Sequence, residues 1–141
     1  MDNLTREQRR KNMQNIRSKG TKPELLIMRE LKRRKKYFAS HADSVIGKPD
    51  IVFRRKKTAV FIDSDFWHGH PSRLIMPKTN IGYWRQKIKR NRRRDKEVNR
   101  KLKRDGWRVI RLWEYDVKNR FDKCILKILL TLQKRRNRNG Q

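Results

Sequence analysis

The apolar residues near the middle of the chain gather in two short runs. Ile51 to Phe53 and Thr58 to Ile62 are rich in β-branched and aromatic residues, a composition typical of strands. Only cationic residues, Arg54 to Lys57, lie between the two runs, and they suit the solvated turn of a hairpin. The pattern therefore predicts two antiparallel strands joined by a basic turn.

Capping boxes near the N-terminus each predict the start of a helix. Thr5-Arg6-Glu7-Gln8 opens a polar stretch that Gly20 can terminate. Thr21-Lys22-Pro23-Glu24 precedes apolar residues at helical spacing, Leu25, Met28 and Leu31. After this second helix, Tyr37 to His41, with Val45-Ile46 as a further candidate, can form an edge strand that leads into the hairpin.

A long basic helix is predicted from Tyr83 to Lys103, and Gly106 follows its end. One face of this helix carries the apolar residues Trp84, Ile88, Val98 and Leu102. Asn91 and Asp95 interrupt that face with polar groups at the same helical spacing.

The C-terminal part predicts one more strand and one more helix. Residues 107–113 alternate and are expected to form a strand with a cationic face. A helix from about Arg120 to Gln133 should follow, before a basic tail, 134–141, that is expected to be disordered. A small mixed sheet covered by helices results from this order of elements. The expected fold class is α/β, with residues 1–133 as a single domain.

The net charge of the chain limits the classes of molecule that it can be expected to bind. Its 42 Lys and Arg residues against 14 Asp and Glu give a net charge of +28 and a pI of about 11.4. Such self-repulsion favours a polyanionic partner, and nucleic acid is the one we expect. No apolar run approaches the length of a membrane span and no signal-peptide pattern opens the chain, so we expect a cytoplasmic, nucleoid-associated protein without a membrane partner.

The cysteine content limits disulfide and zinc chemistry. Cys124 is the only cysteine, which excludes an internal disulfide and a multi-cysteine zinc site. It lies among isoleucines and leucines, and a buried small hydrophobic residue is the favoured interpretation.

Candidate chemistry lies at the ends of the two hairpin strands. Asp50 precedes one strand and Asp63 ends the other, so antiparallel pairing should bring the two carboxylates side by side. They would then repel each other and suit a divalent cation as metal ligands. Either aspartate alone is more often a turn-former or a helix cap. The combination with nearby His68 in a strongly cationic chain instead favours a metal-dependent nuclease.

Short motifs spread along the chain carry a family resemblance. In order, they are Arg10 to Ile16, Gly20 to Glu24, Gly47-Lys48-Pro49-Asp50, Phe66-Trp67-His68-Gly69-His70, Pro77 to Asn80, Tyr83 to Ile88, Asn91 to Asp95, and Gly106 to Val109 leading to Trp113-Glu114. Together they resemble the very short patch repair (Vsr) endonucleases, a family within the restriction-endonuclease-like nucleases whose signature is Pro-Asp followed by an acidic motif. The resemblance covers residues 7 to about 117 and implies a restriction-endonuclease-like small mixed β-sheet flanked by α-helices.

The resemblance also implies roles for individual residues. Asp50 would be the principal ligand of a magnesium ion, Glu24 would join the water network of that ion, and His68 would assist proton transfer. The substrate would be double-stranded DNA, possibly mismatched, nicked near a T:G mismatch.

This chain departs from the family pattern at two places. Asp63 stands where repair members usually carry a second catalytic histidine; a carboxylate there could bind the metal directly but cannot reproduce the proton chemistry of a histidine at neutral pH. The positions of the family's structural zinc ligands read Asp65, His70, Ser72 and about Tyr115, with no thiolate. A structural zinc ion is therefore not expected.

Aromatic and cationic residues near His68 are candidates for DNA contact. Large aromatics are usually core residues, but the family inserts aromatics at these positions into the base stack beside the mismatch. The place of Phe66 and Trp67 next to His68 favours intercalation, whereas Trp84 fits either role. The cations of the long helix, Lys87, Arg90 and Arg93 among them, are expected to contact phosphates rather than form only a solvated face.

Two rival interpretations remain alongside a mismatch-nicking enzyme. A Vsr-like homing or mobile-element endonuclease would keep the chemistry and cut a defined double-stranded target, and the departures at Asp63 and at the zinc positions leave room for it. A catalytically inactive nucleic-acid-binding protein would have the same charge. Retention of Glu24, Asp50, Asp63 and His68 argues against that second rival.

Overall fold

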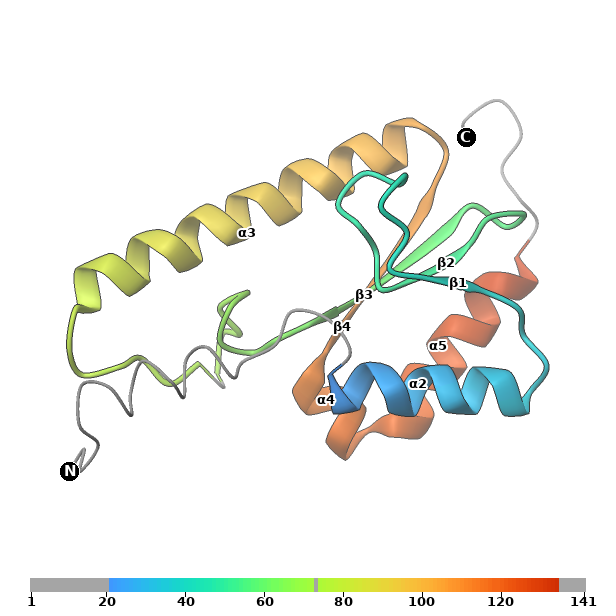
Figure 1. The fold of residues 1–141 in the computed structure, drawn as a ribbon, viewed down its shortest axis with the longest axis horizontal. Helices are drawn as coiled ribbons and strands as arrows, with labels where there is room; N and C mark the ends of the chain where they lie inside the picture. Colours follow the sequence, from blue (N-terminus) through green and yellow to red (C-terminus); the bar gives the residue numbers. More distant parts are fainter. Residues whose placement is uncertain (1–20, 73, 135–141) are drawn as a thin grey trace.

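A mixed β-sheet lies between one long helix and a layer of shorter helices (Figure 1). The computed structural model describes residues 21–72 and 74–134. Their elements are α2 (Lys22–Arg33), β1 (Ala39–Ser40), β2 (Ile51–Phe53), β3 (Thr58–Asp63), α3 (Ile81–Arg104), β4 (Arg108–Trp113), α4 (Glu114–Asn119) and α5 (Phe121–Gln133). This confirms the predicted α/β class and, from α2 onward, the predicted order of the elements, to which the unpredicted α4 is added.

Two predictions fall outside the described residues. They are the helix from Thr5 to Gly20 and nearly all of the basic tail. A single domain over residues 1–133 accordingly stays a prediction.

The four strands follow the order β1-β2-β3-β4. The predicted hairpin is confirmed: β2 pairs with β3 in antiparallel register, with Ile51 opposite Val60. β4 pairs with β3 in parallel, from Thr58 beside Arg108 to Asp63 beside Trp113. A parallel neighbour requires a crossover, and α3 supplies it by returning the chain along one face of the sheet (Figure 1).

Each face of the sheet has its own buried cluster. Ile51, Val60 and Ile62 pack with α2, α4 and α5 on one face, whereas Val52 and Phe61 pack with Leu102 of α3 on the other. Covering on both faces explains why β2 and β3 are continuously apolar rather than alternating. The prediction for Cys124 is confirmed, since its side chain lies in the first cluster.

The cationic face expected for β4 is wrong. Arg108 and Arg111 lie three residues apart and therefore point to opposite faces of the sheet. The Arg108 guanidinium donates to the carbonyl of Thr131 in α5, while the Arg111 guanidinium donates to Asp63. Because helices cover both faces of β4, each arginine side chain donates a hydrogen bond to a protein group instead of forming an exposed cationic face.

The sheet register brings distant parts of the chain to one edge. The His41 amide, just after β1, donates to the Asp50 carbonyl at 3.1 Å, so these two residues are neighbours across the β1–β2 pair. β3 ends at this edge with Asp63. The helix α2 also begins here: Thr21 caps it by accepting from the Glu24 amide at 3.5 Å, as the capping box predicts.

Among the described residues, the helices are too short or too polar for any of them to cross a membrane.

Candidate active site and nucleic-acid interface

Glu24, His41 and Asp50 form a compact cluster at this edge of the sheet. One potential ligand atom from each lies within 4.8 Å of the others. His41 Nε2 is 3.5 Å from Glu24 Oε2, and His41 Nδ1 is 4.0 Å from Asp50 Oδ1. Asp50 Oδ2 accepts from the Ile62 amide at 2.7 Å, which fixes the carboxylate against β3. The α2 start, the β1 end and the hairpin therefore each contribute one metal-competent group.

The electrostatics of Asp50 favour a bound cation. Burial raises the pKa of its carboxyl to about 8, the Ile62 hydrogen bond opposes this rise, and the carboxylates of Glu24 and Asp63 add to it. Glu24 is itself only 1% exposed. Two buried carboxylates beside one imidazole offer a divalent cation oxygen and nitrogen ligands, and a cation there would offset the repulsion. The residues present thus fit a divalent metal ion.

His68 and Asp95 form a second group beside the first. His68 Nδ1 lies 2.5 Å from Oδ2 of Asp95, which belongs to α3. Burial alone would lower the pKa of His68, but the hydrogen bond to Asp95 and the charges of Asp63 and Asp95 outweigh it, and the pKa is raised. This pairing favours the imidazolium form and orients the ring, leaving Nε2 as the second nitrogen for proton transfer.

Asp63 belongs to this second group. Its carboxylate oxygens accept from Arg111 Nη1 at 2.9 and 3.2 Å, and Oδ1 lies 3.7 Å from His68 Nδ1. Arg111 Nη1 is also 3.6 Å from Asp95. Burial raises the pKa of Asp63 more than the charges of His68 and Arg111 lower it. The cation nearest to Asp63 is therefore a guanidinium supplied by the protein.

The expected pair of Asp50 and Asp63 is divided between the two groups. The carboxylates remain close enough for Asp63 to raise the pKa of Asp50. Asp50 gathers with Glu24 and His41, however, whereas Asp63 gathers with His68 and Asp95. That Asp63 binds the same metal ion as Asp50 stays a prediction.

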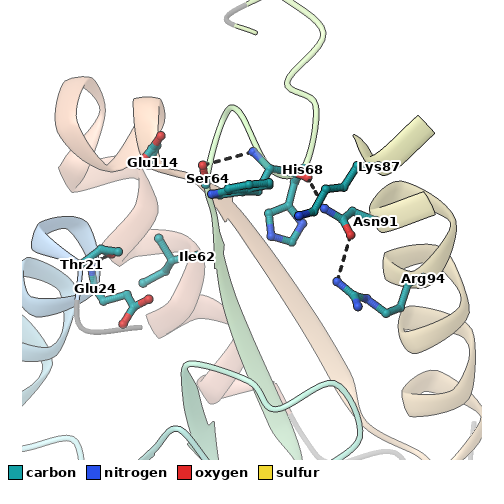
Figure 2. Close-up of a pocket in the computed structure, with 10 residues that line it drawn as sticks. Thr21, Glu24, Ile62, Ser64, His68, Lys87, Asn91, Arg94 and Glu114 are labelled. Carbon is teal, nitrogen blue, oxygen red and sulfur yellow. Dashed lines mark hydrogen bonds between the residues drawn. The ribbon is translucent and has the colours of Figure 1, made fainter. Parts of the chain in front are cut away.

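A cavity of about 400 Å³ is lined by Glu24 of the first group, by His68 of the second and by residues of the basic helix. Figure 2 shows Glu24 of α2 on one side of it, Lys87 and Arg94 of α3 on the opposite side, and His68 between them. Trp67 lines the same cavity. Acidic groups, a histidine and cations thus face one space, which suits a phosphodiester approached by phosphate-binding and proton-transferring side chains.

The aromatic residues predicted near His68 form a cluster of their own. The Phe66 ring lies 5.0 Å from that of Trp67 and 5.6 Å from that of Trp84, centroid to centroid. Tyr83 adds a further ring, 5.0 Å from Trp84. None of these side chains belongs to either buried cluster of the sheet, and Tyr83 is 58% exposed. Their place outside the core is what a DNA-contacting aromatic surface requires.

The loop that carries Trp67 and His68 is fastened to α3. The Asn91 side-chain amide donates to the Trp67 carbonyl at 3.0 Å. Gly69 has φ +65°, and a Cβ there would come within 2.6 Å of the Ile88 side chain. A larger residue would therefore push the loop away from the helix.

The predicted phosphate-binding cations occupy different faces of α3. Lys87 lines the cavity, with Nζ 4.9 Å from the Trp67 ring centroid. Arg90 is exposed. Arg93 lines a separate groove on α3, together with Met76 of the preceding loop. Lys87 is thus the predicted cation nearest to the candidate chemistry, and Arg94, one of the neighbouring cations, also lines the cavity.

The positions where the resemblance implies zinc ligands do come together. His70 packs its ring 4.6 Å from that of Trp113 and 6.4 Å from that of Tyr115, centroid to centroid. The Tyr115 amide donates to Asp65 Oδ1 at 3.5 Å, and the Ser72 amide donates to His70 Nδ1 at 3.1 Å. Ring packing and hydrogen bonds connect these residues directly.

Sequence reasoning missed His41, Asp95 and Arg111 as members of the site. The polar interruption of the α3 apolar face at Asp95 was a usable signal, because a carboxylate on a buried face needs a partner. His41 left a weaker signal as the last residue of a predicted edge strand. Nothing in the sequence pairs Arg111 with Asp63.

Buried carboxylates and a histidine at one edge of a small mixed sheet, next to a cationic helix, are consistent with a restriction-endonuclease-like nuclease and compatible with a divalent metal ion. Residues 1–74 match the family model described as DNA mismatch endonuclease Vsr. The chain belongs to this Vsr family and is a DNA endonuclease.

Relatives span most of the chain. It is 44% identical over 130 residues to the type II nicking enzyme V.NmeDIP of Neisseria meningitidis serogroup C, covering 91% of this chain and 88% of that enzyme. It is 41% identical over 138 residues to the type II nicking enzyme V.HpaIIP of Haemophilus parainfluenzae, covering 96% and 98%. It is 32% identical over 113 residues to the DNA mismatch endonuclease Vsr of Escherichia coli K12, covering 79% and 72%.

Proposed function

We propose that this protein is a magnesium-dependent endonuclease that nicks one strand of double-stranded DNA beside a T:G mismatch. The observation that carries the proposal is the cavity in which Glu24, His68 and Trp67 meet. The cavity thus brings together a carboxylate that can bind a metal ion, an imidazole that can transfer a proton and an aromatic ring that can contact a base. A DNA substrate would also keep the protein with the nucleoid in the cytoplasm.

Asp50 and Glu24 are the proposed carboxylates of the magnesium site. Magnesium keeps most of its waters and needs only a few protein oxygens. When bound, it would supply Lewis-acid activation of water and offset charge developing on the phosphate. The burial and mutual repulsion of these carboxylates, described above, support this role.

His68 is the proposed proton donor. The hydrogen bond to Asp95 raises its pKa, so the imidazolium persists to higher pH than in a free histidine, and Nε2 can protonate the leaving oxygen. Asp95 acts through His68, which it orients. Asp63 remains a proposed site residue. Its partners Arg111 and His68 support a role in holding the imidazole, alongside its predicted role as a metal ligand.

Phe66, Trp67 and Trp84 are the proposed wedge for the mismatch. Inserting aromatic rings costs base stacking, and that cost is lowest where base pairing is already weak. The location of the rings outside both cores supports insertion over a structural role. Lys87, Arg90 and Arg93 are the proposed phosphate contacts; their charge contributes affinity without sequence information.

Single-strand cleavage is proposed from the relatives, two of which are named as nicking enzymes. A direct test uses duplexes labelled separately on each strand, one with a T:G mismatch and one fully matched, incubated with and without magnesium. We expect a single labelled product, from the mismatched duplex only, and none from Asp50→Asn. Cleavage of both strands of a matched duplex at a defined sequence would favour a homing-type endonuclease instead. No cleavage of any duplex would favour the inactive binder.

A further inference from the structure

His41 occupies a position that the sheet itself constructs. Its amide bonds to the Asp50 carbonyl across the β1–β2 pair, so His41 has Asp50 as its strand neighbour. The backbone of His41 is left-handed, with φ +49°. Histidine is one of the few residue types enriched in this conformation, which clusters at functional sites, although four other described residues, Lys35, Lys48, Lys57 and Asn80, also adopt it. The register and the turn together direct the imidazole between Glu24 and Asp50.

One buried nitrogen of the His41 imidazole, Nδ1, has no hydrogen-bond partner. Within the part of the chain that the structure describes, Nδ1 is the only buried side-chain nitrogen or oxygen atom without such a partner. It lies 4.0 Å from Asp50 Oδ1, too far for a hydrogen bond. Nε2 lies 3.5 Å from Glu24 Oε2. A buried polar atom without a partner costs free energy, and Nδ1, in a ring that lies between two carboxylates, can recover that cost by binding a cation.

We propose that His41 is a third ligand of the metal ion held by Asp50 and Glu24. This rests on the proposed function, because it adds a nitrogen to the site suggested for magnesium. One potential ligand atom from each of the three residues lies within 4.8 Å of the others, close enough to converge on one ion after small side-chain rotations. His68 and Asp95 belong to the neighbouring group and contribute no ligand.

A nitrogen ligand changes which metal ions the site prefers. Imidazole binds manganese, cobalt and nickel better than it binds magnesium, which favours oxygen ligands. The site therefore accepts magnesium through its carboxylates and binds the transition-metal ions more tightly through His41. An all-oxygen site would show this preference more weakly.

Manganese(II) provides a direct probe, because pulsed electron paramagnetic resonance detects a nitrogen nucleus bound to the ion. We expect nitrogen coupling in the full-length protein with manganese, and its loss in His41→Asn. Asparagine tolerates a left-handed backbone, and an unchanged thermal midpoint without metal would verify the fold. His68→Asn and His70→Asn are the matched controls, and both should keep the coupling.

Calorimetry gives a second readout. His41→Asn should weaken cobalt(II) binding by at least about tenfold, the low end of what even indirect partners of a metal contribute, and magnesium binding far less. Unchanged nitrogen coupling or unchanged cobalt affinity in His41→Asn would overturn the proposal. If Asp50→Asn still abolished manganese binding and cleavage, only the role of His41 would fall. If Asp50→Asn left both intact, the proposed function would fall with it.

Discussion

Replacing Asp50 by asparagine should abolish cleavage and yet stabilise the metal-free protein. The pKa of the Asp50 carboxyl is raised from 3.8 to about 8, chiefly by burial. Between these two values the unfolded chain releases a proton that the folded protein retains. The free energy of unfolding therefore falls as pH rises from about 4 to about 8. At pH 7 this amounts to at most about 4 kcal/mol.

Asparagine keeps an oxygen to accept from the Ile62 amide but carries no charge. We expect it to recover roughly half of that penalty, about 2 kcal/mol, which would raise the melting temperature by several degrees for a chain of this length. The stability of the variant should also depend less on pH between pH 4 and 8 than that of wild type, and the raised pKa values of Asp63 and His68 account for the dependence that remains.

Thermal unfolding at several pH values, with chelator or with magnesium, tests this reasoning. Magnesium should raise the melting temperature of wild type by mass action, because it binds the folded state alone, and should leave Asp50→Asn unchanged. A lower melting temperature for the variant at pH 7 in chelator would refute the electrostatic argument. An equal magnesium-induced rise in both proteins would show that the ion binds elsewhere.

Other expected outcomes concern the wedge, the proton donor and zinc. Trp67→Ala should abolish the preference for mismatched over matched duplex while changing affinity for matched DNA little; a loss of about 3 to 5 kcal/mol in stability, typical of a core tryptophan, with an unchanged preference would refute intercalation. Asp95→Asn removes the contact that raises the pKa of His68, so the alkaline limb of the kcat/KM profile should move to lower pH; an unmoved limb would contradict a proton-donor role for His68. Metal analysis of purified His41→Asn should find no stoichiometric zinc, and one tightly held zinc ion per chain in this variant would show that the zinc-ligand positions near His70 were misassigned.

Local patterns predicted the elements of this fold well because each element satisfies a local rule. The hairpin followed from two β-branched runs around a basic turn, and α2 from a capping box with Pro23 in its first turn. The helix α4 escaped prediction because its six residues are too few to show a period. The cationic face assigned to β4 failed because Arg108 and Arg111 are an odd number of residues apart, which alternation places on opposite faces.

The site was less predictable because its contacts are not local. Asp63 and Arg111 are 48 residues apart in sequence, and only the parallel register of β3 and β4 brings them to one face. His41 acquires its role through the β1–β2 register, which no motif encodes. Glu24 and His68 were accessible from the sequence because each lies within a motif that carries the family resemblance.

The attachment of the Trp67–His68 loop to α3 has a consequence for fidelity. Asn91 holds the backbone of Trp67, and Asp95, one turn further along the same helix, holds the ring of His68. A rigid helix moves its side chains together, so if DNA displaced Trp67 as the proposed wedge requires, the imidazole of His68 would move with it. The proposed recognition of the mismatch and the proposed proton transfer would then both depend on the position of α3. In a duplex whose base stack does not admit the aromatic rings, the imidazole would stay away from the strand to be cut. Discrimination between mismatched and matched DNA would then act on the rate of cleavage as well as on binding.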